Sequence, residues 1–291
     1  MNKMTKGEKV FELFNVIIMA FMVVICAYPF LYITFASLSE PIELMAFNGM
    51  LWKPLGFSLD AYQEVLKNKM VGITYVNTIF YVTAGTAVSV ITTAMGAFIL
   101  SRDDFKIKKF INVIIVITMF FSGGLIPFYL TLKNLGFVNS RLIMVLPTAI
   151  GTWNLMVMRT AFAGVPKSLE ESAVIDGAND IEIFIKIILP LSKSIIAVMI
   201  LFYGVGIWNA WFNASLFLKD RKLYPLQLYL REILIYSSTD SMMGGVESDR
   251  VAIGETIKYA TIIVTTIPVL LVYPFLQRYF VKGVMIGAIK G

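Results

Sequence analysis

The sequence predicts an all-α integral membrane protein with six transmembrane helices, and three observations support this. The 291 residues are 58% hydrophobic and only 15% charged, whereas soluble domains carry roughly 25% charged residues. The mean hydropathy is +0.77. Six apolar stretches have the length of about 20 residues that a helix needs to cross a hydrocarbon core of ~30 Å. A cytosolic enzyme, a secreted domain and a disordered chain are therefore excluded.

The six spans are expected at residues 13–36, 76–100, 110–132, 142–162, 194–218 and 259–280. They form one membrane domain, 13–281, between short tails at 1–12 and 282–291. Three lysines precede the first span, as in a signal peptide, but the apolar run is too long for one and no small-residue cleavage site follows it. We therefore expect a retained signal-anchor helix.

Glycines and prolines inside two spans predict bends. Gly123-Gly124 and Pro127 lie in the third span, and Pro268 and Pro274 lie in the sixth. Such residues are tolerated in membrane helices where neighbouring groups satisfy the freed backbone atoms.

Two longer segments are expected on the outer side of the membrane. Residues 37–69 are rich in proline and glycine and predict a loop with a short helix at 59–66, capped by Ser58. Residues 219–258 carry six basic and six acidic residues and predict a solvated loop.

The placement of basic residues predicts the orientation of the chain. Six spans put both termini on one side. If that side is the cytoplasm, the tails and the short segments 102–109 and 159–193 carry more Lys and Arg than the outer segments, as the positive-inside rule requires. We expect the chain in the cytoplasmic membrane of a bacterium with both termini inside. The net charge of +6 then reflects how the chain is oriented in the membrane rather than binding to nucleic acid.

Missing residue types exclude several kinds of chemistry. The chain has no histidine and one cysteine, Cys26, which excludes histidine metal sites, Ser-His-Asp triads, internal disulfides and Fe–S ligation. The pattern G-x-x-x-x-G-K-[ST] is absent, so no P-loop hydrolyses nucleotide here. We expect no metal, no cofactor and no catalytic residue in this chain.

The expected spans are almost free of charged residues. Carriers driven by protons or sodium ions need such groups inside the membrane, so ion coupling is disfavoured. A membrane enzyme acting on a lipid-linked substrate would need paired acids or bases at the interface, and Asp103-Asp104 is the only candidate; ordinary solvation in a basic loop explains that pair. Energy must then arrive from outside, and the polar segment 163–190, which we call the elbow, is the expected entry.

The elbow predicts two short helices joined by a turn. Ser168 can cap the first helix, with Glu171 three residues later completing a capping box. Gly177 supplies the positive φ that ends this helix. Asn179 can cap the second helix, again with an acid, Glu182, three residues later.

Apolar residues are expected to line one face of each elbow helix. They are Leu169, Ala173 and Val174 on the first helix, and Ile181, Phe184, Ile185 and Ile188 on the second. Pro190 marks the return to the fifth span. An amphipathic hairpin lying in the membrane interface would show the same pattern, and the residues alone leave this alternative open.

The elbow resembles the EAA loop of ABC importer membrane subunits, which reads E-A-A, three residues, G, nine residues, I-x-L-P. The matching positions are Glu171, Ser172, Ala173, Gly177, Ile187, Leu189 and Pro190. The one departure is Ser172 in place of the middle alanine. The resemblance implies a MetI-like permease fold with cytoplasmic coupling helices.

Further segments resemble sugar-importer permeases of the MalG type, particularly the branch named for lipoprotein and polysaccharide uptake. They are residues 57–62, 77–78, 97–102, 122–127, 158–160, 224–227, 230–231 and 287–291. Nearly the whole chain is covered. The resemblance implies import of a carbohydrate, such as an oligosaccharide; a permease for a non-sugar solute such as a peptide is the alternative.

The resemblance also implies the partners. The elbow would dock in a cleft of a cytoplasmic ATPase, of which two copies bind ATP and Mg²⁺, and Leu169, Val174 and Asp176 would join the matched positions in this contact. A second, homologous permease, an extracytoplasmic sugar-binding protein and membrane lipid would complete the assembly. The 219–258 loop would help to receive the binding protein, and residues 285–291 would reach between the ATPase subunits.

Sugars are held by aromatic faces and by planar hydrogen-bonding groups. The richest such cluster lies in the fifth span and comprises Tyr203, Trp208, Asn209, Trp211 and Asn213. Helical spacing would put the two tryptophans on one side and the two asparagines on another. An aromatic belt at the outer interface, with asparagines that join helices, explains the same residues, as packing does for Asn112, Trp153 and Asn154.

Overall fold

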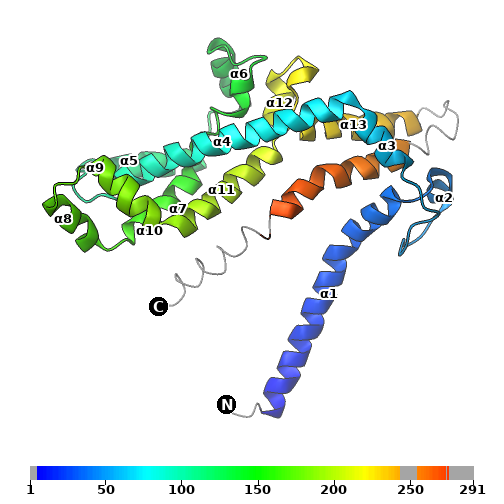
Figure 1. Ribbon diagram of the computed structural model, residues 1–291, viewed down its shortest axis with the longest axis horizontal. Coiled ribbons are helices and arrows are strands. Elements are labelled where there is room, and N and C mark those ends of the chain that lie inside the picture. The colour runs from blue at the N-terminus through cyan, green and yellow to red at the C-terminus, as the bar shows by residue number, and fades with distance from the viewer. Residues whose placement is uncertain (1–4, 243–253, 273, 275–291) are drawn as a thin grey trace. The chain divides into compact units, whose positions relative to one another are not determined.

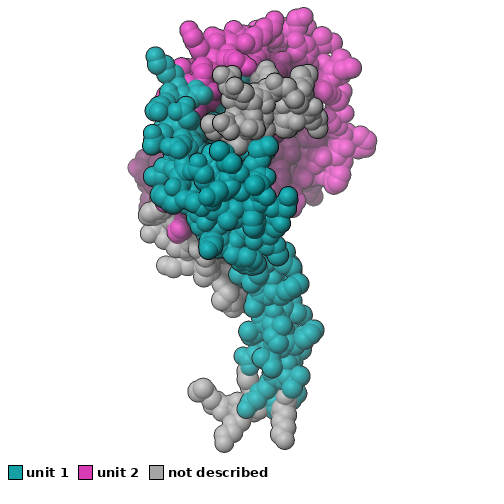
Figure 2. All heavy atoms as spheres, turned by 90° about the vertical axis from the view of Figure 1, so that its right-hand side faces the viewer, with its two compact units in different colours: residues 1–69, 230–267 teal, residues 70–229, 268–291 magenta. Residues whose placement is uncertain are grey.

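The structure, a computed structural model, describes residues 5–242, 254–272 and 274. These residues form helices and turns and contain no strand (Figure 1). The chain divides into two compact units, which Figure 2 colours separately: unit 1 holds residues 1–69 and 230–267, and unit 2 holds residues 70–229 and 268–291.

Three of the described helices are long and apolar enough to cross a membrane, namely Gly7–Ser37, Lys69–Ser101 and Gly254–Val272. Two helix pairs reach that length only together and are sharply bent, Lys108–Phe120 with Leu125–Asn134 and Asp180–Leu191 with Lys193–Trp208. The described residues thus give three spans, or up to five if each bent pair counts as one. The six predicted spans are not all continuous helices.

In unit 1 the long helix α1, Lys6–Ser37, contains the first predicted span. It begins inside the predicted tail because Thr5 and Glu8 form a capping box there. Apolar side chains are exposed all along its first two-thirds, as in a helix that spans a membrane.

The outer segment of unit 1 holds two short helices. Helix α2 covers Pro41–Ala46 and helix α3 covers Asp60–Lys67. The second lies one residue from its predicted place. The predicted cap at Ser58 is wrong because Leu59 holds the N-cap position without a side-chain cap, and the Ser58 hydroxyl accepts instead from the amide of Asp60, the first helical residue, at 3.1 Å. Ala36, Leu44 and Leu51 form a small core that joins the end of α1 to α2.

In unit 2 the second span is the continuous helix α4, Lys69–Ser101. The third is broken as predicted: α5, Lys108–Phe120, and α6, Leu125–Asn134, meet at 114°. Gly124 makes this bend possible because its φ of +85° lies in the region that favours glycine.

The fourth span was predicted as one helix over 142–162, and this was wrong. A 3₁₀ turn at Arg141–Met144 and an irregular stretch come first, and α7 covers only Thr152–Ala163. Twelve residues of helix span about 18 Å. Irregular backbone at membrane depth must find partners inside the protein, and here the carbonyls of Thr148 and Ala149 accept hydrogen bonds from hydroxyls of α4 at 3.1 and 2.7 Å.

The fifth span was predicted as one helix over 194–218, and it is broken as well. Helix α11, Lys193–Trp208, is followed by a turn and by α12, Phe212–Phe217. The outer loop predicted at 219–258 contains a 3₁₀ turn at Arg221–Leu223 and the helix α13, Leu226–Met242. The chain from 243 to 253, the end of the sixth predicted span and the tail 282–291 lie outside the described residues.

Two apolar cores organise unit 2. One joins the C-terminal part of α4 to α7, α11 and the chain before α11, through buried residues such as Phe98, Met158 and Met199. The other joins the N-terminal part of α4 to α12 and the 3₁₀ turn, around Tyr81, Ile143 and Phe217. Figure 1 shows α5, α7 and α11 beside the α4 end at Ser101, where α8, α9 and α10 also gather.

Candidate functional site

The elbow folds as two helices with a turn, as its sequence predicted. Helix α8 covers Lys167–Ile175 and helix α9 covers Asp180–Ile183, followed by a π-helical turn at Phe184–Ile188 and the short helix α10, Leu189–Leu191. This whole run belongs to unit 2. It then turns by 83° into α11.

Gly177 ends α8 with a φ of +83°, which confirms the predicted turn. The Gly177 and Ala178 amides donate to the carbonyls of Val174 and Ala173 at 3.0 and 2.9 Å, closing the helix end. A Cβ added at Gly177 would have no heavy atom within 4 Å. The turn is therefore open to a partner on its outer side.

The second capping box is confirmed and the first is not. The Asn179 side chain accepts from the Glu182 amide at 3.0 Å, and the Glu182 carboxylate accepts from the Asn179 amide at 3.1 Å. The Lys186 side chain and this amide lower the pKa of Glu182. The predicted cap at Ser168 is wrong because α8 starts two residues earlier, with Pro166 at its N-cap and no side-chain cap.

The apolar stripe predicted for the second helix is also wrong. Ile181 and Ile185 are exposed, while Ile183 and Ile188 are fully buried. The spacing of five residues between the buried pair is that of a π-helical turn, where the Leu189 amide donates to the Phe184 carbonyl. Pro190 follows directly and lacks an amide to continue the α-helical pattern.

The predicted coupling residues fall into two groups. Leu169, Glu171, Ser172, Val174, Asp176, Gly177 and Pro190 are exposed, whereas Ala173, Ile187 and Leu189 are half-buried. Ala173 and Leu189 pack against the core of unit 2, so Ala173 is not the outward apolar group that the sequence suggested. Helix α8 buries no residue at all, and Ile175, at its end, is 86% exposed.

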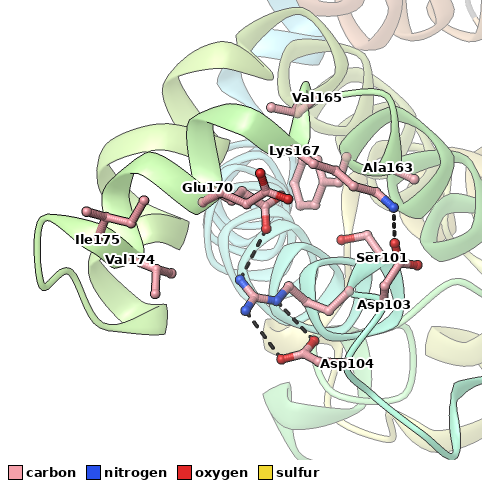
Figure 3. A pocket seen from close by; sticks show the side chains of 12 residues that line it. Ser101, Asp103, Asp104, Ala163, Val165, Lys167, Glu170, Val174 and Ile175 are labelled. Atoms are coloured by element: carbon pink, nitrogen blue, oxygen red, sulfur yellow. Dashed lines mark hydrogen bonds and ion pairs between the residues drawn. The ribbon is translucent and has the colours of Figure 1, made fainter.

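Arg102 connects the elbow to the end of α4. Its guanidinium lies 3.1 Å from the Glu170 carboxylate on α8 and 3.2 Å from the Asp180 carboxylate at the start of α9. A third carboxylate, that of Asp104, lies at 3.3 Å, and Figure 3 shows Glu170 and Asp104 converging on this group. The Arg102 and Glu170 side chains are only 18% and 21% exposed, and the guanidinium also lies over the Phe98 ring.

Asp103 is tied to two lysines. The Lys108 ammonium lies 2.6 Å from its carboxylate, and the Lys167 ammonium contacts its other oxygen. These two cations lower the pKa of Asp103 to about 2, and hydrogen bonds from Arg102 lower the pKa of Asp104. Asp103 and Asp104 therefore serve as ion-pair partners, and neither is held protonated as a general acid must be.

A hollow of about 440 Å³ lies between this loop, the end of α7 and α8. Its walls carry the side chains of Ser101, Asp103, Lys167, Glu170 and Val174 (Figure 3). Sequence reasoning missed this arrangement. The only available signal was the surplus of acids in the elbow beside a basic loop, since Arg102 and its elbow partners are far apart in the chain.

The sugar-path candidates do not form the helical face that was predicted. Trp208 ends α11, Asn209 is its C-cap, and Trp211 precedes α12. Trp208 packs edge-on against Tyr75, with ring centres 6.0 Å apart, and Trp211 packs against Phe212. The Asn209 amide group donates to the Val205 carbonyl in its own helix at 3.0 Å; Asn213 is half-buried.

Tyr203 is a packing residue of unit 2. It is 6% exposed. Its hydroxyl lies 2.6 Å from that of Thr93 on α4 and accepts from the Gly151 amide at 2.9 Å. Tyr203 thus fixes the start of α7 rather than presenting its hydroxyl to a passing ligand.

Residues 2–286 match the family described as "Binding-protein-dependent transport system inner membrane component". The chain belongs to this family. Members of the binding-protein-dependent family are membrane components of transport systems and are not enzymes, so this chain is a transport component of a bacterial inner membrane.

Two curated relatives from Bacillus subtilis (strain 168) match almost end to end. The polygalacturonan/rhamnogalacturonan transport system permease protein YtcP is 41% identical over 96% of this chain and 99% of its own length. Protein LplC is 38% identical over 99% of this chain and 97% of its own length. The LplC match confirms the branch that the sequence resembled.

A solved structure shares the fold. It is the crystal structure of a bacterial ABC transporter involved in the import of the acidic polysaccharide alginate, and one of its chains is 30% identical to this one with a TM-score of 0.86. The match covers 96% of this chain and 100% of that chain. The family match covers all the residues that the structure describes, and the fold match covers almost the whole chain.

Proposed function

We propose that this chain is a membrane-spanning permease subunit of an ABC importer that carries a carbohydrate, an oligosaccharide in particular, across the cytoplasmic membrane. The observation that carries the proposal is the end-to-end match to permeases named for polygalacturonan/rhamnogalacturonan and arabinooligosaccharide transport, and to a chain of a transporter involved in alginate import. The peptide alternative has no support among these relatives, because the substrates in their names are saccharides.

The chain works in an assembly. A second, homologous permease pairs with it, two copies of an ABC ATPase bind ATP and Mg²⁺ on the cytoplasmic side, and an extracytoplasmic binding protein delivers the sugar. Both termini face the cytoplasm. The transport path opens outward when ATP closes the ATPase dimer and inward after hydrolysis, with the bend at Gly124 as one flexible point.

The elbow is the point where the ATPase acts on this chain. Its exposed side combines apolar groups, Leu169, Val174 and Ile175, with the acids Glu171 and Asp176. A groove with apolar walls and a basic residue is complementary to that surface. The open turn at Gly177 lets a partner approach the backbone closely.

Cysteine cross-linking tests the contact directly. Cys26 is the only cysteine, so a Cys26→Ser background leaves no thiol, and Ser172→Cys then offers a single exposed one on α8. We expect a short bifunctional reagent to join this residue to the ATPase in the assembled transporter. Cross-linking only to lipid or to the second permease would contradict the proposed role of the elbow.

Substitution of Gly177 tests the close approach. We expect Gly177→Trp to reduce uptake or to release the ATPase on purification. Gly177→Ala is the matched control, since it shares the positive φ, which costs about 1 kcal/mol, but adds only one atom in open space. Normal uptake and normal co-purification in the tryptophan variant would refute the proposal.

The cargo is tested with the cognate binding protein. We expect acidic and neutral plant oligosaccharides to raise the melting temperature of that protein, and peptides to leave it unchanged. Uptake of the stabilising sugar into proteoliposomes, dependent on ATP and on the binding protein, would complete the test. Stabilisation by peptides alone would overturn the carbohydrate assignment.

A further inference from the structure

We propose that Arg102 is the positioning residue that makes α8, α9 and the end of α4 move as one body, so that a push on the elbow reaches the spans. This inference rests on the proposed role of the elbow and adds the residue that transmits its movement. Arg102 touches neither sugar nor nucleotide in this proposal; it acts through two carboxylates.

Helix α8 is only weakly anchored by apolar contacts, because Ala173 is its one residue that packs, half-buried, against the core. None of its residues is buried, and the open turn at Gly177 separates it from α9. By contrast, α9 and the turn after it are anchored by Ile183 and Ile188 in the core and by Phe184 against Phe98 of α4. A force on α8 alone would therefore bend the chain at Gly177 unless a further contact held the two helices together.

Arg102 bridges this weak point. One guanidinium contacts Glu170 on α8 at 3.1 Å and Asp180 on α9 at 3.2 Å, on opposite sides of Gly177. Arginine suits the position because its planar group offers several donors in fixed directions. The Arg102 and Glu170 side chains are about four-fifths buried, so their ion pair is less screened than an exposed one. The Asp180 side chain is 71% exposed, so the contact to α9 is the weaker of the two.

Arg102 is itself held in place at the end of α4. Its carbonyl accepts from the Lys108 ammonium at 2.7 Å, and the carbonyl of Leu100 accepts from Arg159 of α7 at 3.2 Å. Its guanidinium lies over the Phe98 ring, 5.6 Å from the ring centre. A displacement of Glu170 is therefore passed to α4 rather than absorbed by a mobile side chain.

The test is the ratio of ATP hydrolysed to sugar imported by the complete transporter in proteoliposomes. We expect Arg102→Gln to lower uptake about tenfold, within the range seen for residues that carry coupling, while the ATPase stays bound and hydrolysis continues. The double variant Glu170→Gln/Asp180→Asn removes both partners, leaves Arg102 in place, and should raise the ratio to the same extent. If Arg102→Gln fails to assemble, the double variant provides the test.

Asp104→Asn is the matched control. Asp104 also pairs with Arg102 but lies two residues away in the same loop, so its loss breaks no link between helices and should leave the ratio at the wild-type value. An unchanged ratio in both the Arg102→Gln variant and the double variant would overturn the proposal. This holds whether ATP hydrolysis and uptake are both normal or both fall together. A purely structural role would make both rates fall together.

The outcome is separable from failure of the proposed function. If the elbow did not meet the ATPase, the Ser172→Cys cross-link would be missing in an otherwise unaltered chain. If only the role of Arg102 is wrong, that cross-link forms and the ratio stays normal in the variants.

Discussion

Tyr203→Phe should loosen the irregular stretch before α7. Tyr203 is only 6% exposed. The substitution removes its hydroxyl, which forms a hydrogen bond with the Thr93 hydroxyl at 2.6 Å and accepts one from the Gly151 amide at 2.9 Å. An unpartnered buried donor costs about 1–3 kcal/mol, and hydrogen bonds inside membranes average about 0.6 kcal/mol with a maximum near 1.7. Loss of two such bonds gives about 1–2 kcal/mol.

Hydrogen exchange of the purified protein measures this directly. A local loss of about 1–2 kcal/mol corresponds to roughly 5- to 30-fold faster exchange of the Gly151 amide, since 1.4 kcal/mol is a factor of ten. Tyr75→Phe is the control, because the Tyr75 ring packs on Trp208 while its hydroxyl bonds to no described residue. Unchanged exchange at Gly151 in Tyr203→Phe, or an equal rise in the control, would refute the reasoning.

Two further predictions concern an outer turn and the charged loop. Asn139 has a φ of +56° and accepts from the amides of Lys219 and Asp220 at 3.0 and 2.9 Å; we expect Asn139→Ala to destabilise the protein by about 1–2 kcal/mol and Asn139→Gly to cost less, since only alanine is strained there. Thermal unfolding in detergent ranks the two, and the opposite order would contradict the assignment. The pKa of Asp103 is lowered from 3.8 to about 2, so its stabilising effect is present above pH 3.8 and is lost as the pH falls toward about 2; the difference in melting temperature between wild type and Asp103→Asn should vanish over that interval, and a constant difference would show another cause.

Hydropathy predicted where the chain meets lipid but not how each helix is broken. The second span is a continuous helix, as expected, while the fourth begins only at Thr152. Composition cannot separate these cases, because both segments are apolar. The break before α7 depends on the hydroxyls of Ser89, Thr92 and Tyr203, which satisfy its backbone from other helices.

Local signals were reliable where neighbours in the chain decide the outcome. The positive φ of Gly177 and the capping box of Asn179 with Glu182 follow from contacts within three or four residues, and both were predicted. The cap at Ser168 failed because α8 starts two residues earlier, with Pro166 at its N-cap.

The ion pairs of Arg102 could not be predicted in the same way. Glu170 and Asp180 lie far along the chain from Arg102 and reach it only because α4, α7 and α9 share one core. Asp103 and Asp104 looked like a lone acidic pair for the same reason, since the sequence does not reveal Lys167 beside them.

The π-helical turn at Phe184–Ile188 sets the direction in which α8 and α9 point. An α-helix advances about 100° per residue, so losing one residue from this wider turn would swing α8 and α9 by about that angle around the axis of the chain that follows, with every residue of both helices preserved. Two permeases with identical α8 and α9 sequences but turns of unequal length would point these helices at different neighbours. The number of residues in this one turn, and not only the sequence of the motif, therefore determines which ATPase a permease can bind.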